Sequence, residues 1–353
     1  MSYADGMAAF NLEKPKKIPR TEYSLEMHYE YLQKLTGYNL SDEENINRNI
    51  LKARQILFEK LNYGFIWNVC IGGDIFSSFH TSMGHAEYME KGTDYNNHIF
   101  CPFKDTEDVF EFSFEEHYEI PKHPDIVKKY NDNLSMMNSL YPDVVNTTGV
   151  YVTLMSGLIE IFGWNMLLTA LGEDPERFGK VADRYAKFIQ PYFDALADCD
   201  CPVAKVHDDI VWTSGPFVNP KWYRKYIFPH YKDYFDPIKE SGKKILFTSD
   251  GTYDMFFGDI AEAGADGFVL EPTNDLAYCA ENYGKTHSIV GAADTRVLLS
   301  NNKEKIFEEV RRNTEIGKDC PGFFLAVGNH IPPNTPVSAD EWYQEAYEKY
   351  SVR

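Results

Sequence analysis

Basic side chains are scarce in this chain relative to acidic ones. Its 353 residues include 35 Lys and Arg against 54 Asp and Glu, which gives a formal net charge of −19. This charge repels nucleic acid and anionic membranes, so neither is expected as a partner. No cluster of arginines is evident either, which disfavours a polyanionic small substrate.

Cysteine pairs, long apolar runs and a leader segment are also lacking. The six cysteines show no spacing typical of a disulfide framework or a zinc knuckle, and the Cys199–Cys201 pair is expected to be structural. No run of 18 apolar residues occurs, so no ordinary transmembrane helix is expected. The first residues carry no basic region followed by an apolar stretch, which predicts a cytoplasmic protein.

What the chain does contain is an alternation of short apolar runs and helical patterns. Strands are predicted at 203–212, 245–247, 267–270, 287–291 and 323–327, and the helices after them at 220–241, 253–263, 274–283, 303–316 and 339–350. Five such units predict a parallel sheet. Upstream patterns add strands at 64–70 and 149–153 and helices at 41–60, 124–139, 157–171 and 174–199. The count favours an α/β fold of the (β/α)8 TIM barrel class, and no glycine-rich dinucleotide loop supports an open sheet instead.

All 353 residues are predicted to form one barrel domain with two additions. Residues 1–62 are expected to be an N-terminal helical arm, with residues 1–40 outside the barrel wall and Ser41 as the N-cap of the helix. Residues 75–147 are predicted to be an elaborated insertion over the barrel mouth. The histidines of this insertion, His85 among them, are interpreted as surface residues rather than ligands.

The carboxyl ends of the strands meet on one rim of a barrel, so polar residues there are candidates for function. Residues 245–251 show this best. Their apolar run ends directly in Thr248, Ser249 and Asp250. The candidate catalytic residues at the strand ends are Asp208, Asp250, Glu271 and His330. The candidate substrate-binding residues there are His207, Ser249 and Asn329.

Two strand ends carry more than one acid or an obvious partner. Asp208, rather than Asp209, is predicted to face the cavity because of its spacing from Val206. Asp294 is the weakest candidate, since it precedes Arg296 and is expected to form a structural ion pair with it.

Carboxylates that share a site repel one another. This raises the pKa of at least one of them and suits it to protonate a leaving oxygen. Asp250 is the first candidate for that acid. A metal ion is the competing explanation, with Asp250, Glu271 and His330 as its ligands.

Several segments together resemble the uroporphyrinogen decarboxylase superfamily. They are Val206-His-Asp-Asp-Ile210, Thr213-Ser-Gly-Pro216, Asn219-Pro220, Ile245-Leu-Phe-Thr-Ser-Asp-Gly251, Glu262-Ala-Gly-Ala-Asp266 and Ile331-Pro-Pro-Asn-Thr-Pro336. They follow the family's order over about residues 145–350. The resemblance implies a (β/α)8 barrel, in agreement with the alternation of strands and helices.

That superfamily contains porphyrinogen decarboxylases and cobalamin-dependent methyltransferases. The decarboxylases carry an arginine-containing segment after the first strand, and residues 66–74 of this chain hold no arginine. Thiol-methylating members bind zinc through a His-x-Cys pair and a distal Cys. Thr248, Asp250 and Asn329 stand at those positions here. The resemblance therefore implies the O-demethylase branch, whose N-terminal arm is similar to residues 18–23.

In that branch the enzyme passes a methyl group from a methoxylated, often aromatic, substrate to Co(I) of cobalamin on a separate corrinoid protein. The resemblance thus implies a corrinoid protein and a small methoxylated substrate as partners. Aromatic side chains that suit a flat ring are Trp67, Phe79, Tyr151, Trp164 and Trp212. A uroporphyrinogen decarboxylase-like decarboxylase and a non-catalytic ligand-binding barrel are the alternatives, and a homodimer is left open.

Overall fold

A computed structural model of the chain describes residues 2–41, 44–85 and 99–353. Its strands form two sheets, and within each sheet all neighbouring strands are parallel. The first sheet joins β1 (Phe65–Ile66) to β2 (Val145–Asn146). The second follows chain order through β3 (Thr148–Val150), β4 (Val203–His207), β5 (Lys244–Thr248), β6 (Gly267–Val269), β7 (Ser288–Val290) and β8 (Phe323–Phe324).

The N-terminal segment closes the barrel between β8 and β1. Arg20 forms parallel bridges with Tyr63 on one side and Leu325 on the other. The backbone N–H of Leu325 also donates to the carbonyl of Pro19 at 3.0 Å. The closed wall confirms the predicted (β/α)8 barrel. The expectation that residues 1–40 lie outside it is wrong, because this inserted piece is too short to show a strand pattern.

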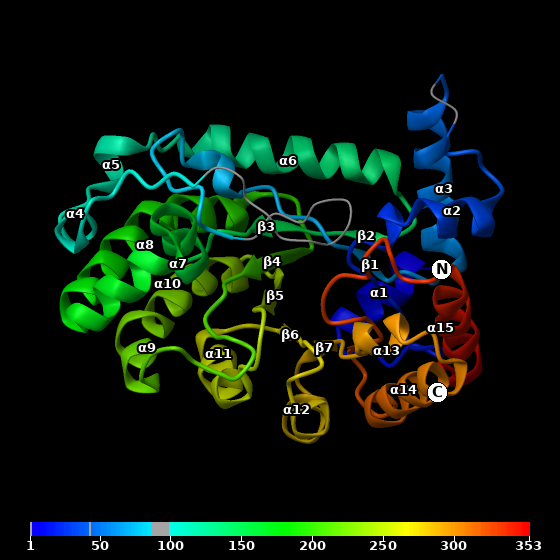
Figure 1. Cartoon of the computed structure of the whole chain (residues 1–353). Coiled ribbons are helices and arrows are strands. Elements are labelled where there is room, and N and C mark those ends of the chain that lie inside the picture. Colours follow the sequence, from blue (N-terminus) through cyan, green and yellow to red (C-terminus); the bar gives the residue numbers. More distant parts are fainter. Residues whose placement is uncertain (1, 42–43, 86–98) are drawn as a thin grey trace.

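Helices surround the wall, and Figure 1 shows them outside the strands. In chain order they are α1 (Ser2–Phe10), α2 (Tyr29–Thr36), α3 (Ile46–Lys60), α4 (Thr106–Phe110), α5 (Phe114–His117), α6 (His123–Leu140), α7 (Met155–Glu173), α8 (Pro175–Asp198), α9 (Pro220–Tyr226), α10 (Phe228–Glu240), α11 (Phe257–Ala263), α12 (Leu276–Tyr283), α13 (Thr295–Leu299), α14 (Lys303–Gly317) and α15 (Val337–Tyr350).

Two helix predictions need correction. The predicted helix 220–241 is divided at Ile227 into α9 and α10. Pro229 is the second residue of α10, and because proline has no N–H it cannot continue the hydrogen bonding of a preceding helix. The helix after Ser41 begins only at Ile46, with Asn45 in the N-cap position. Residues 42–43 of the expected capping box lie outside the described residues.

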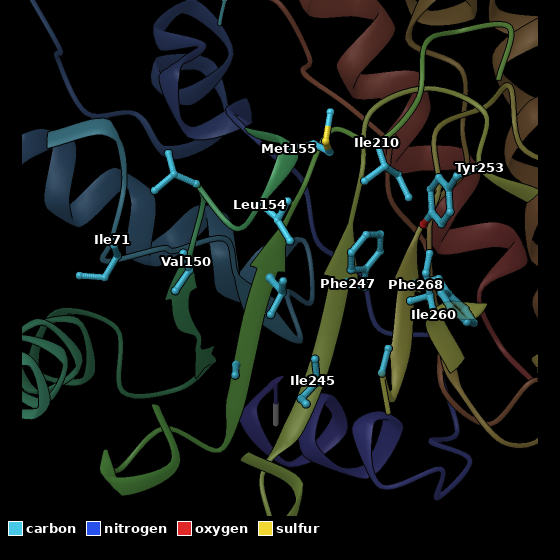
Figure 2. Packing of buried hydrophobic residues seen from close by; sticks show 14 of the residues in the cluster. Ile71, Val150, Leu154, Met155, Ile210, Ile245, Phe247, Tyr253, Ile260 and Phe268 are labelled. Carbon is cyan, nitrogen blue, oxygen red and sulfur yellow. The ribbon is translucent and has the colours of Figure 1, made fainter. Parts of the chain in front are cut away.

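The larger apolar core lies between the strands and the surrounding helices. Val150, Ile245, Phe247 and Phe268 project from β3, β5 and β6 into it, as Figure 2 shows. Burying these side chains contributes roughly 1.5–3 kcal/mol each relative to exposure. This core fixes the strands and therefore the positions of the residues that follow them.

A second apolar cluster fills the inside of the barrel at its N-terminal end. Phe65, Val203 and Leu246 belong to it, and Phe10 of α1 packs on Phe65 with ring centroids 5.4 Å apart. Helix α1 thus closes this end with apolar side chains. An open cavity is left for the opposite end, where the strands reach their carboxyl termini.

Helix α7 is long and apolar enough, by length and composition alone, to cross a membrane. The sequence argument, which looked for an unbroken run of 18 apolar residues, did not identify this helix. In the described chain, 61% of the most apolar window of α7 is buried inside the protein. It packs against α8 and α4, which is how a core helix behaves.

Candidate active site at the carboxyl ends of the strands

A cavity of about 290 Å³ opens at the carboxyl ends of the strands. Its wall takes side chains from most of the barrel, which is the usual place for a TIM-barrel active site. The side chains that line it include Tyr23, Trp67, Tyr151, Lys205, His207, Thr248, Asp250, Asn329 and His330. Of the residues predicted from sequence, the structure brings together His207, Asp250, Asn329, His330, Trp67 and Tyr151.

Strand β4 sets the depth of the cavity. Because side chains alternate along a strand, Val203, Lys205, His207 and Asp209 share the inward direction. Val203 belongs to the second apolar cluster, which forms the floor of the cavity at the N-terminal end of the barrel. Lys205 and His207 line the cavity above this apolar floor. Sequence reasoning missed Lys205. A charged residue within the otherwise apolar run of a central strand was the available signal.

Lys205 is buried beneath two aromatic rings. Its Nζ lies 4.4 Å from the ring centroid of Trp67 and 5.8 Å from that of Tyr23. Burial lowers the pKa of Lys205 to about 7, although Asp250 acts in the opposite direction. Among the described residues, Lys205 has no carboxylate within ion-pair distance.

Asp209 is held between two histidines. Its Oδ2 lies 3.1 Å from Nε2 of His85, and its Oδ1 lies 3.3 Å from Nε2 of His207. The Nδ1 of His85 in turn lies 2.9 Å from Oε2 of Glu160. Burial alone raises the pKa of Asp209, but His207 and His85 outweigh it and bring this pKa to about 2. Asp209 is therefore an anion at neutral pH.

His85 is a functional neighbour that the sequence interpretation placed on the surface, and that interpretation is wrong. Burial lowers the pKa of His85, whereas its hydrogen bonds to Asp209 and Glu160 raise it to about 9. His207 differs, because burial lowers its pKa to about 4. It stacks on Tyr151 with ring centroids 4.0 Å apart. One histidine is thus a cation and the other is neutral.

Asp250 is the acid of the cavity. The Asp250 side chain is exposed to the cavity, but desolvation by the protein around it, with repulsion from Asp209 and Glu271, raises the pKa of Asp250 well above its usual range. Its backbone N–H donates to Oδ1 of Asp209 at 3.0 Å. The anionic neighbour therefore favours the protonated form of Asp250, in the direction that the sequence argument predicted for one member of the cluster.

Gly251 allows the chain to turn directly after Asp250. Its φ of +85° is left-handed, and a Cβ there would lie 2.4 Å from the carbonyl oxygen of Trp212. Its N–H donates to Oε2 of Glu271 at 2.8 Å. The other oxygen of Glu271 accepts a hydrogen bond from Asn329 Nδ2. Glu271 lines a neighbouring cavity of about 380 Å³, which shares Asn329 and His330 with the first.

His330 lies at the edge between the two cavities. Its ring lies 4.3 Å from the ring of Tyr23, and its Nδ1 lies 3.1 Å from Oγ of Ser24. Burial lowers the pKa of His330, with Lys205 acting in the same direction. His330 is therefore neutral at neutral pH and is a weaker proton donor than Asp250.

Asp208 does not line the cavity, contrary to the prediction. Val206 packs into the core outside the barrel, so the inward series runs through Asp209 instead. Asp208 accepts hydrogen bonds from the Ser156 N–H at 2.6 Å and from the Tyr231 hydroxyl at 2.5 Å. These contacts make it a buried structural residue.

Ser249 and Trp212 also lie outside the cavity lining. The Ser249 hydroxyl accepts from the Ile210 N–H at 3.3 Å and donates to the Asp250 carbonyl at 3.1 Å. Trp212 packs on Trp164, with ring centroids 5.9 Å apart, and its side chain is 46% exposed. Both residues are therefore removed from the substrate-binding set.

Phe79 and Asp294 have structural contacts. Phe79 stacks on His117 at 4.3 Å, away from the main cavity. Asp294 caps α13 and pairs with Arg296 at 2.8 Å, which confirms the expected ion pair.

Donor atoms of His207, Asp209 and Asp250 lie within 4.8 Å of one another, a spacing that a metal ion could use. This set differs from the predicted one, which combined Asp250 with Glu271 and His330. However, both oxygens of Asp209 already face histidine nitrogens or the Asp250 N–H. These contacts hold the Asp209 carboxylate in a network of hydrogen bonds with two histidines.

Comparisons with known proteins place the chain in a family. A family model described as uroporphyrinogen decarboxylase (URO-D) matches residues 88–350. The uroporphyrinogen decarboxylase of Carboxydothermus hydrogenoformans is 26% identical over 211 residues, 59% of this chain and 59% of that protein. That of Thermus thermophilus is 26% identical over 157 residues, 44% of each. The chain thus matches less than two thirds of the length of these curated relatives.

A solved structure covers nearly the whole chain. A methyltransferase from Methanosarcina mazei matches with a TM-score of 0.65 and 15% identity, covering 99% of this chain and 98% of that one. At this identity the likeness shows the barrel fold alone. The match to the family model spans well over half of the sequence and includes every strand from β2 to β8. The chain therefore belongs to the uroporphyrinogen decarboxylase family.

Proposed function

We propose that this protein is a corrinoid-dependent methyltransferase. It moves a methyl group from a small methoxylated, aromatic substrate to Co(I) of cobalamin carried by a separate corrinoid protein. The observation that carries the proposal is a cavity in which Asp250, an acid with a raised pKa, stands among aromatic walls, with no arginine among the described residues of the lining.

The size and walls of the cavity support a small flat substrate. A volume of about 290 Å³ lies at the lower end of ordinary small-molecule sites. Trp67 and Tyr151 provide apolar ring faces, and among the described lining residues Lys205 is the only Lys or Arg. A tetrapyrrole with many carboxylates would need more cations than this site provides.

The network around Asp209 prepares Asp250 for acid catalysis. Cleavage of a methyl ether leaves negative charge on oxygen, which an acid must neutralise. Because Asp209 is ionised between His85 and His207, repulsion keeps the proton on Asp250. A positioned acid of this kind contributes about 10²–10⁴-fold to a reaction rate.

The corrinoid would supply a strong cobalt nucleophile that accepts the methyl group. This chain's part is to bind the donor, exclude water and protonate the leaving oxygen. A zinc-thiolate acceptor site does not fit, because Thr248, Asp250 and Asn329 stand where thiol-methylating members carry their ligands. No cysteine belongs to the cavity lining among the described residues. A cytoplasmic reaction with a soluble partner is consistent with the net charge of −19.

The direct test is methyl transfer in vitro. The purified chain is mixed with a reduced corrinoid protein and a panel of methoxyarenes, and cobalt methylation is followed by visible spectroscopy. We expect methylation with at least one donor, at a rate proportional to enzyme concentration. Absence of cobalt methylation with every donor and several corrinoid proteins would contradict the proposal.

A decarboxylase is the second candidate, favoured by the names of the curated relatives. Release of carbon dioxide from uroporphyrinogen would support it. The lining of the first cavity argues against it, because its described residues include no arginine to bind the carboxylates of such a substrate, and Arg296 of the neighbouring cavity is paired with Asp294.

A further inference from the structure

One layer of the barrel interior carries hydrogen-bond donors without acceptors. Directly above the floor residues Phe65, Val203 and Leu246, the same three strand positions continue two residues later as Trp67, Lys205 and Thr248. All three of the upper residues line the main cavity. We call Trp67, Lys205 and Thr248 the donor layer.

The groups of the donor layer have few partners. Trp67 Nε1 and Thr248 Oγ1 are buried and form no hydrogen bond within the described part of the chain. In the described part of the chain, Lys205 Nζ lies over the faces of Trp67 and Tyr23. Buried polar groups are normally paired, so three donors together without an acceptor indicate that the acceptor comes from a ligand.

The acids above the donor layer do not provide that acceptor. Both oxygens of Asp209 are occupied by His85, His207 and the backbone of Asp250. Asp250 is exposed to the cavity, and its pKa is raised by desolvation and by its anionic neighbours, which favours its protonated form. The layer between the apolar floor and these acids therefore lacks negative charge.

We infer that the donor layer is an oxyanion site in which Lys205 binds the leaving oxygen of the substrate. This inference rests on the proposed function. It adds Lys205 to the residues that act on the substrate, and it specifies the side of the cavity on which the leaving oxygen lies. It makes Lys205 a catalytic residue in addition to Asp250.

The direction follows from the geometry of a displacement. A methyl acceptor on another protein can approach only from the mouth, because α1 closes the opposite end with Phe10. In an in-line displacement, the leaving oxygen lies on the side of the methyl carbon away from the acceptor. That side faces the floor, and Lys205 is the charged residue nearest the floor.

The carbon–oxygen bond of the donor breaks with both electrons left on oxygen, and the methyl carbon forms its new bond with an electron pair of the acceptor. The negative charge on oxygen develops beside the ammonium of Lys205, and a proton from Asp250 converts the product to a phenol or alcohol. A fixed cation that pairs only with the developing charge stabilises the transition state more than the substrate.

The test uses the full-length protein, with Lys205→Met and Lys205→Gln as variants. Lys318→Met is the matched control, because Lys318 is exposed and lies before β8, at the opposite end of the barrel. Methyl transfer to a reduced corrinoid protein is measured with para-substituted anisoles whose phenol products span a wide range of acidity. A second assay measures binding of 4-nitrophenol, whose phenolate has a distinct visible band.

We expect both Lys205 variants to lose about 10²–10³-fold with the poorest leaving groups and much less with 4-nitroanisole, as when one oxyanion donor is removed. A purely structural role would lower the rates for all donors by the same factor, and that result would overturn the inference. Unchanged rates in both variants would overturn it as well. The control variant should match the wild type throughout.

The binding assay separates failure of the inference from failure of the proposed function. We expect the wild type to bind 4-nitrophenol as the phenolate at a pH where the free phenol is mostly protonated, and the Lys205 variants not to do so. Equal phenolate binding by wild type and variants would overturn the oxyanion site even if methyl transfer occurs. Phenolate binding that depends on Lys205, without methyl transfer, would uphold the site and contradict the methyltransferase.

Discussion

The two ends of the barrel are built from the same strands and yet have opposite chemistry. At the N-terminal end, inward side chains such as Val203 and Leu246 form an apolar floor that Phe10 closes. Two residues further along β4 the inward side chain is Lys205, and the groups beyond it are ionisable. Within one strand, inward residues near the N-terminal end therefore stabilise the fold, and inward residues near the carboxyl end line the site.

The largest expected effect concerns the acid at the mouth. Asp250→Asn removes the proton donor and keeps the size of the side chain. We expect methyl transfer to fall about 10²–10⁴-fold, because the leaving oxygen loses its acid. The rate is measured as cobalt methylation under single-turnover conditions.

Asp236→Asn is the control, since Asp236 pairs with Lys232 on the surface of α10. The Asp250 variant should unfold at the same or a higher temperature, because a desolvated carboxyl is replaced by a neutral amide. A variant that keeps wild-type rates with poor leaving groups would show that Asp250 is not the acid.

Substitutions in the apolar floor should change the free energy of unfolding rather than the rate of methyl transfer. Phe10 is 3% exposed, and its ring centroid lies 4.8 Å from that of Phe324. Phe10→Ala should lower the free energy of unfolding by about 3–5 kcal/mol, since it opens a cavity in a packed core. Urea unfolding followed by circular dichroism measures the change.

Tyr3 provides the comparison within the same helix, because its side chain is 44% exposed. Tyr3→Ala should change the free energy of unfolding by no more than about 0.5 kcal/mol. Equal effects of the two substitutions would show that α1 does not close the barrel through Phe10.

The repeating parts of the molecule could be predicted from sequence, because they depend on local patterns. The strands around residues 245–247 and 267–270 agree closely with β5 and β6. The ion pair of Asp294 with Arg296 was also predictable, since a single residue separates them and they stand at the N-cap and in the first turn of α13. Local spacing determines each of these features.

The site itself depended on directions and long-range contacts that spacing does not supply. The choice of Asp208 over Asp209 followed from assuming that Val206 faces inward, whereas it packs outside the barrel. Because side chains alternate along a strand, the wrong direction for Val206 places Asp208 in the cavity instead of Asp209. His85 reaches Asp209 across 124 residues of sequence, and no local pattern announces that contact.

Lys205 of the donor layer should combine the properties that the two ends of the barrel keep apart. It should lower the stability of the fold and also contribute to the reaction. Lys205→Met replaces a buried ammonium with an apolar side chain of similar length. We expect the free energy of unfolding to rise by about 1–4 kcal/mol at pH 7 or below, as for other buried charges replaced by apolar groups. Urea unfolding at several pH values measures this gain.

The sign of the pH dependence follows from the pKa of Lys205. It is about 7 in the folded protein and 10.5 for an ordinary lysine, so the unfolded chain binds more protons between these values. Wild-type stability should therefore rise with pH across this window, and the advantage of the variant should shrink. A gain that stays constant from pH 7 to pH 9 would contradict the burial of an ammonium.

The smallest expected effect concerns a raised carboxyl outside both cavities. Asp340, in the first turn of α15, forms no hydrogen bond through either oxygen among the described residues, and His28 Nε2 lies 3.7 Å away. Burial raises the pKa of Asp340 to about 8 from its usual 3.8. Like Asp250 it has a raised pKa, but among the described residues it lines neither of the two cavities at the mouth.

Asp340→Leu should therefore change stability and leave methyl transfer unaltered. Because the folded protein binds an extra proton between about pH 4 and pH 8, wild-type stability falls as the pH rises through that window. The variant should lack this fall and should exceed the wild type by about 1–3 kcal/mol above pH 8, since no buried carboxylate has to form. Glu341→Leu, at a neighbouring side chain that is 41% exposed, should show no comparable pH dependence. Loss of methyl transfer in Asp340→Leu would mean that a raised carboxyl pKa marks function even away from the mouth, and the contrast between the two ends of the barrel would then fail.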